Sequence, residues 1–135
     1  MKIINGHNAV LGRLSSTTAK HLLKGEEVTI VNAEQVIITG DPNRIAKKYL
    51  GMRKIGSPQH GPFFPKKADA ILKRTIRGMV PYKTPAGRTA MRKLRVYVGI
   101  PEDLKDKHID NVAVKPVKSN YTRLSDVSRT MGCRT

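Results

Sequence analysis

The sequence has little cysteine, few acidic residues and no long apolar run. A single cysteine among 135 residues excludes a disulfide framework and a cysteine-rich metal site. No segment approaches the roughly 18 consecutive apolar residues that a membrane-spanning helix needs, and the first residues lack the apolar stretch of a signal peptide. The length suits one domain. We therefore expect a cytoplasmic protein with no membrane partner.

Catalytic and metal-binding patterns are also missing. Asp69 is the one carboxylate between Arg44 and Arg95, whereas a magnesium-dependent nuclease needs clustered carboxylates. The four histidines form no HxxH or HxxxH pair, which disfavours a zinc site. The segment from Gly6 to Ser15 fails the phosphate-loop pattern in its spacing and in its lysine and hydroxyl positions. The sequence thus predicts no catalytic residues, no metal, no cofactor and no small-molecule substrate.

Positive charge is abundant and unevenly placed. The formal net charge is +16, yet residues 1–43 sum to zero and residues 96–135 to +2. Residues 44–95 hold fifteen basic residues and one acidic residue, a net charge of +14. Because like charges repel in a folded protein, a polyanionic partner is the simplest explanation. A solvated, lysine-rich helix face is the weaker alternative, since the block is also rich in arginine, which favours bidentate phosphate contacts.

The first half of the chain predicts short strands between helices. Apolar periodicity predicts a helix over Gly12–Lys24, and Asp41 with Pro42 begins a second helix that points Ile45, Ala46 and Tyr49 inward and Lys47 and Lys48 outward. Short β-branched runs predict three strands: Lys2–Asn5, Val28–Asn32 and Val36–Thr39.

The second half predicts a loop and two basic helices. Glycine and proline punctuate Gly51–Lys67, which predicts a long irregular loop. The helix Ala68–Gly78 should bury Leu72, Ile76 and Met79, and Thr84 caps another helix before Pro85. On that helix Ala90, Met91 and Leu94 should face inward, while Arg88, Arg92 and Arg95 recur at four and three residues and form one basic stripe.

The remaining segments are shorter. Strands are expected at Val96–Gly99 and Val112–Val117, and a terminal helix at Ser125–Met131 with Ser125 as its cap and Gly132 as its stop. Strands that alternate with helices favour an α/β fold with a mainly parallel sheet covered on both faces.

Phe63 and Phe64 lie in the basic loop and permit two interpretations. Exposed aromatic rings in a basic loop could stack on nucleic-acid bases. The rings could equally anchor the loop against the core, and the sequence does not separate these alternatives.

Three ordered motifs resemble one family. The first motif is the opening Leu11-Gly12-Arg13-Leu14-Ser15-Ser16. The second is Val31-Asn32-Ala33-Glu34, followed by Ile38-Thr39-Gly40. The third runs from Arg74 through Gly78-Met79-Val80-Pro81 and Gly87-Arg88 to Leu94-Arg95-Val96-Tyr97-Val98-Gly99. Together they resemble the L-thirteen family of universal large-subunit ribosomal proteins, in order from about Ile3 to Pro101. Asn5 in place of the family's usual aspartate, and the short connection at residues 25–27, resemble its archaeal and eukaryotic branch.

The resemblance implies a three-layer α/β/α domain over residues 1–101 with a mainly parallel four-stranded sheet and the basic loop 51–67. Residues 102–135 would form a C-terminal extension. It also implies a structural constituent of the large ribosomal subunit that binds large-subunit ribosomal RNA, supports its assembly and contacts neighbouring ribosomal proteins. The rival functions are a small RNA-modifying or RNA-cleaving enzyme, and a DNA-binding regulator with a recognition helix.

Fourteen basic residues are the candidates for RNA contact. Arg74, Arg77, Lys83, Arg88 and Arg92 are expected as rigid contacts, Arg53, Lys54, Lys66 and Lys67 as loop contacts, and Lys47, Lys48, Lys73 and Lys93 as further contacts. Arg13 could pair with a glutamate or with RNA. Gly78 and Gly87 are expected to serve backbone geometry or a close approach of RNA.

Overall fold

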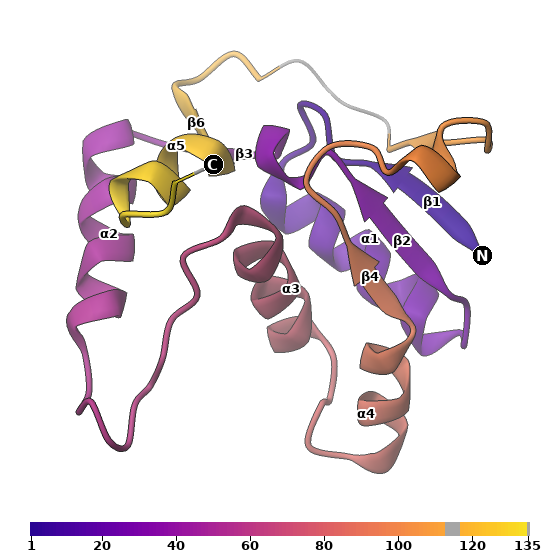
Figure 1. Cartoon of the computed structure of the whole chain (residues 1–135), viewed down its shortest axis with the longest axis horizontal. Coiled ribbons are helices and arrows are strands. Elements are labelled where there is room, and N and C mark those ends of the chain that lie inside the picture. Colours follow the sequence, from indigo (N-terminus) through magenta and orange to yellow (C-terminus); the bar gives the residue numbers. More distant parts are fainter. Residues whose placement is uncertain (113–116, 135) are drawn as a thin grey trace.

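The computed structural model describes residues 1–112 and 117–134 (Figure 1). Its helices are α1 (Leu11–Leu23), α2 (Pro42–Lys54), α3 (Ala68–Met79), α4 (Pro85–Arg92) and α5 (Leu124–Thr130), with two 3-10 turns, η1 (Ala33–Gln35) and η2 (Glu102–Leu104). Its strands are β1 (Lys2–Asn5), β2 (Val28–Val31), β3 (Ile37–Thr39), β4 (Leu94–Val96), β5 (Asp110–Asn111) and β6 (Tyr121–Arg123).

Four strands form a parallel sheet in the order β4-β2-β1-β5, as the family resemblance implies. Ile30 of β2 lies opposite Ile4 of β1 on one side and Val96 of β4 on the other. All four residues of β2 are buried. This burial is typical of a central strand in a parallel sheet, because both of its faces are covered.

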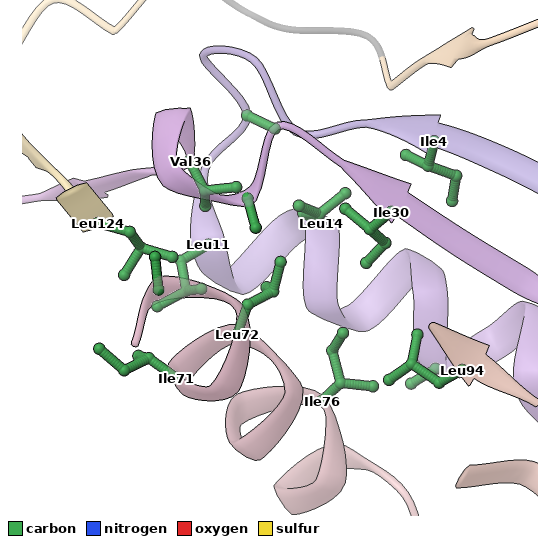
Figure 2. Close-up of a cluster of buried hydrophobic side chains, with 14 of the residues drawn as sticks. Ile4, Leu11, Leu14, Ile30, Val36, Ile71, Leu72, Ile76, Leu94 and Leu124 are labelled. Carbon is green, nitrogen blue, oxygen red and sulfur yellow. The ribbon is translucent and has the colours of Figure 1, made fainter. Parts of the chain in front are cut away.

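Alternate strand residues bury opposite faces of the sheet. Ile4 and Ile30 pack with Leu14 of α1 and Ile76 of α3 in the main core (Figure 2). On the other face, Ile3 and Val31 pack with Leu104 of η2 and with partly buried Tyr97 and Ile109. The fold therefore has three layers, and the segment from Tyr97 to Ile109 forms the thinner covering layer.

The strand predicted near Val36–Thr39 forms, but it lies outside the parallel sheet. Strand β3 pairs with β6 in antiparallel register, with Ile37 opposite Arg123. The strand predicted at Val96–Gly99 is instead β4, two residues earlier. Gly99 has a φ of +71°, which is incompatible with extended backbone. The prediction of a strand at Val112–Val117 is wrong at Val112 and Val117, because β5 ends at Asn111 and neither residue belongs to a strand. Residues 113–116 lie outside the described residues.

Helix α2 begins as predicted but ends later. The Asp41 side chain accepts a hydrogen bond from the Asn43 backbone N–H at 3.2 Å, and Pro42 occupies the first turn. The helix continues through Gly51 to Lys54, so the loop begins at residue 55 rather than 51. Methionine, arginine and lysine are good helix formers and carry the helix past the single glycine.

Two further helix details correct the sequence prediction. Met79 is exposed because it ends α3, and Val80 takes the buried position that follows. Helix α5 begins at Leu124 with Arg123 in the cap position, so Ser125 does not cap it. Gly132 ends that helix region with a φ of +87°, as predicted.

The segment after Pro101 completes the main core. Leu124 and Met131 are 0% exposed and Val127 is 1% exposed, and all three belong to the same apolar cluster as Leu72 and Ile76. Figure 2 shows Leu124 pointing toward Leu11 and Ile71. Helix α5 is therefore part of the packed interior.

Candidate nucleic-acid interface

Helices α3 and α4 line an open basic cleft of about 510 Å³. Helix α3 supplies Lys73 and Arg77, helix α4 supplies Arg88 and Arg92, and strand β4 supplies Arg95. Tyr82 lies at the turn between the two helices, and Met91 and Leu94 complete the lining. Five cationic side chains from three elements therefore converge on one concave surface.

Helical and strand periodicity place these cations together. Helix α3 buries Leu72 and Ile76 against the core, so Lys73 and Arg77, each one residue further along, lie outside the buried stripe. Arg88 and Arg92 are four residues apart and share an exposed face of α4. In β4, Leu94 is buried and Arg95 is exposed, as alternation along a strand requires.

The connection between α3 and α4 is closely packed. The Thr84 hydroxyl donates to the Pro81 carbonyl at 2.8 Å and accepts from the Gly87 backbone N–H at 3.2 Å. A Cβ on Gly87 would lie 1.9 Å from the Pro81 carbonyl oxygen. The Arg77 guanidinium lies 5.1 Å from the centre of the Tyr82 ring, a cation–π distance. The Thr84 hydrogen bonds and the close approach of Gly87 to Pro81 therefore fix the position of α4 against the connection.

A second hollow of about 320 Å³ adjoins the first. Lys73, Arg77 and Met91 line both hollows, so they form one surface along α3, which we call the α3 basic face. Its outer end is formed by Phe63, Pro65, Ala70 and Arg74.

Among the described residues, no acidic side chain neutralises the positive charge of this surface. No carboxylate lines either hollow in the described chain. The ion pairs found among the described residues involve Lys2, His21, His108 and Arg129, all outside the α3 basic face. Unpaired cations in a concave site attract anions and focus the field on the cleft.

The structure brings together some predicted contact residues. Lys73, Arg74, Arg77, Arg88 and Arg92 lie on the α3 basic face. Lys83 is exposed in the turn before α4, and its carbonyl accepts from Arg88 Nη2 at 3.3 Å. Arg95 and Tyr82 are absent from the fourteen candidates although they line the cleft. The helical arginine stripe predicted through Arg95 is wrong in its last member, because α4 ends at Arg92 and both Leu94 and Arg95 belong to β4. Arg95 reaches the cleft from the strand instead, and the sequence carries no signal for Tyr82.

Other candidates have structural partners elsewhere. Arg53 donates to the Met131 carbonyl at the end of α5, and Lys93 Nζ donates to the Gly25 carbonyl at 2.8 Å. The Lys66 carbonyl accepts from the Ser128 hydroxyl at 2.7 Å, and Lys67 lines a separate pocket with Glu34 and Tyr97. The remaining candidates are exposed on other surfaces: Lys47, Lys48 and Lys54 on α2, and Arg13 on α1, with no ion pair to Arg13 among the described residues.

The two loop phenylalanines have different environments. Phe64 packs against the core and meets Tyr49 edge to face, with ring centres 5.7 Å apart. Burial raises the pKa of the Tyr49 phenol above its ordinary value. Phe63 is 69% exposed. Of the two interpretations, Phe64 therefore anchors the loop against the core, whereas the ring of Phe63 is available for stacking.

The described residues contain no group of three or more histidine, cysteine, aspartate or glutamate side chains that could hold a metal ion. Across the same part of the chain, every helix is too short or too polar to span a membrane. Asp69 lies in the first turn of α3, as expected, where its negative charge interacts favourably with the positive end of the helix dipole.

Comparisons with known proteins agree on one family. The family model described as Ribosomal protein L13 matches residues 1–103. A Methanosarcina barkeri protein named "Large ribosomal subunit protein uL13" is 48% identical over 139 residues, covering 99% of each chain. Proteins of the same name from Methanocaldococcus jannaschii and Methanopyrus kandleri are 42% and 39% identical, covering 99% and 96% of this chain and 99% and 86% of their own. The similarity to these archaeal proteins therefore continues beyond Pro101.

Proposed function

Because the chain belongs to the L-thirteen family of ribosomal proteins and is a structural constituent of the large ribosomal subunit rather than an enzyme, we propose that it binds large-subunit ribosomal RNA in the cleft between α3 and α4. One observation carries this proposal. Five cationic side chains line that cleft, and no carboxylate among the described residues opposes them. Cytoplasmic location and contacts with neighbouring ribosomal proteins follow as part of the same proposal.

The cleft suits phosphate groups approaching from two directions. Lys73 and Arg77 line one wall, while Arg88 and Arg92 line the other. Arginine offers a planar fork of donors that matches phosphate oxygens. Each phosphate contact releases condensed counterions, so RNA affinity should fall steeply with salt. Two RNA segments that meet in the cleft would be held together, which is how the protein would support subunit assembly.

The outlying candidates divide into two groups. Lys47, Lys48, Lys54 and Arg13 are exposed and extend the proposed contact surface to α2 and α1. Lys66 and Lys67 remain candidates at the start of α3. Arg53 and Lys93 act first as anchors, because each donates to a backbone carbonyl distant in sequence.

Replacing both Arg88 and Arg92 by alanine tests the cleft. We expect weaker binding to purified large-subunit ribosomal RNA and a salt-dependence slope that is smaller by about 2, since each lost phosphate contact removes about one unit. Fluorescence anisotropy across a potassium chloride series measures both quantities. Replacement of exposed Lys105 and Lys107 by alanine removes the same charge outside the cleft and should change the slope less. An unchanged slope for the arginine variant would exclude this cleft.

Sedimentation separates the proposal from its rivals. The protein should travel with large ribosomal particles and leave them only at high salt, because phosphate contacts are screened. Selective binding to duplex DNA would favour a DNA-binding regulator, and cofactor-dependent or magnesium-dependent turnover of RNA would favour an enzyme.

A further inference from the structure

We propose that the hollow beside Phe63 takes one unpaired RNA base, which stacks on the Phe63 ring while its phosphates lie on the α3 basic face. This inference rests on the proposed function and specifies the form of RNA that the surface accepts. It assigns to the loop 55–67 a binding task separate from the charge-driven contacts of the α3–α4 cleft.

Phe63 is exposed far beyond what its chemistry favours. Phe63 is 69% exposed, while Phe64 next to it packs on the core. An aromatic ring is a large apolar surface, and burying it against a partner is favourable. Because the loop already uses Phe64 as its anchor, Phe63 is not needed to hold the loop in place.

The backbone that carries Phe63 is held from several sides. Arg74 donates from Nη1 to the Phe63 carbonyl at 3.0 Å, and its guanidinium lies 4.7 Å from the centre of the Phe64 ring. Ser57 and Gly61 exchange two backbone hydrogen bonds of 3.2 and 2.9 Å, which close the tip of the loop. A ring on a fixed backbone loses little entropy when a ligand stacks on it. Arg74 is thus a positioning residue here.

The lining of the hollow indicates a ligand with a flat ring and a negative charge. Pro65, Ala70 and Met91 provide apolar surface beside Phe63, and Lys73 and Arg77 provide charge. Nucleotides combine these two properties, and aromatic side chains commonly stack on bases of single-stranded RNA. A base inside a duplex is already stacked and paired, so its faces are closed to Phe63. The ligand is therefore an unpaired nucleotide.

A tryptophan at position 63 gives a direct optical test. The sequence contains no tryptophan, so the variant Phe63→Trp has a single indole reporter. We expect a 12-nucleotide oligoadenylate to quench its emission, and a 12-base-pair RNA duplex to bind without comparable quenching. The variant Tyr121→Trp is the matched control, because Tyr121 is 45% exposed on β6 and lines neither hollow of the α3 basic face. Its emission should change little with either RNA.

Affinity provides a second readout. Stacking on an aromatic side chain contributes about 1–3 kcal/mol per base, so Phe63→Leu should weaken oligoadenylate binding by about 5-fold to 150-fold. The same variant should bind the duplex as the natural protein does, because its cations are unchanged. Phe63→Tyr retains a ring and should retain oligoadenylate affinity.

The failures of the two proposals look different. Unquenched emission from the Phe63→Trp variant, or equal quenching by duplex, overturns the unpaired-base site while leaving duplex binding in the cleft intact. Absence of binding to any RNA at low salt overturns the RNA function and this site together.

Discussion

Replacing Gly87 by alanine should lower the free energy of unfolding by about 2–4 kcal/mol, because the new methyl group has no room. Its Cβ would lie 1.9 Å from the Pro81 carbonyl oxygen and 2.9 Å from the Tyr82 nitrogen. Both are backbone atoms, so relief requires α4 to shift away from the connection that precedes it. The shift would also weaken the Thr84 hydrogen bond that caps α4.

The matched control is Gly78→Ala in α3. A Cβ at Gly78 meets nothing within 4 Å. At an exposed helix position alanine is more stabilising than glycine by about 1 kcal/mol, so this variant should have a slightly higher free energy of unfolding. Urea unfolding followed by circular dichroism compares the two. Equal stability of the two variants would show that the close approach at Gly87 relaxes without cost.

The same pair of variants bears on the RNA cleft. Because Gly87 fixes where α4 lies, Gly87→Ala should also weaken RNA binding by displacing Arg88 and Arg92 from the opposite wall. A methyl group at Gly78 would meet open space instead of another part of the protein. If Gly78→Ala stabilises the free protein yet lowers RNA affinity, the exposed glycine permits a close approach of RNA.

Local chemistry was predictable from the sequence because its causes lie within a few residues. Asp41 with Pro42 and Thr84 with Pro85 begin helices through hydrogen bonds two and three residues away. The arginine spacing in α4 likewise predicts a shared face. The extra turn of α2 was missed, because Gly51 weakens a helix without ending one.

Contacts between segments that are distant along the chain could not be predicted from the sequence. The carbonyl that Arg53 reaches is 78 residues away, and that of Lys93 is 68 residues away. A basic side chain in a basic block looks the same whether it faces a carbonyl or a phosphate. The antiparallel pairing of β3 with β6 has the same cause, since apolar alternation predicts a strand but not its partner. Tyr82 lines the cleft because the turn between α3 and α4 places it there, and the sequence pattern does not predict that turn's path.

The C-terminal helix supplies the second large effect: Leu124→Ala should lower the free energy of unfolding by about 2–5 kcal/mol. Leu124 is 0% exposed and packs in the main core beside Leu11 and Ile71. Truncation removes its apolar contacts and leaves a cavity, since surrounding helices relax only partly. Leu23→Ala is the matched control, because Leu23 is the last residue of α1 and is 54% exposed. That variant should stay within about 0.5 kcal/mol of the natural protein.

Denaturant unfolding of the Leu124 and Leu23 variants also tests where the domain ends. If residues 102–135 were an extension with a fold of their own, Leu124→Ala would leave the main transition in place and produce a separate early phase. Because Leu124 and Met131 share one apolar cluster with Leu72 and Ile76, we expect a single cooperative transition shifted to lower urea with an unchanged slope. The basic wall of α3 rests on this cluster. Loss of α5 packing should therefore loosen the helix that presents Lys73 and Arg77 to the cleft.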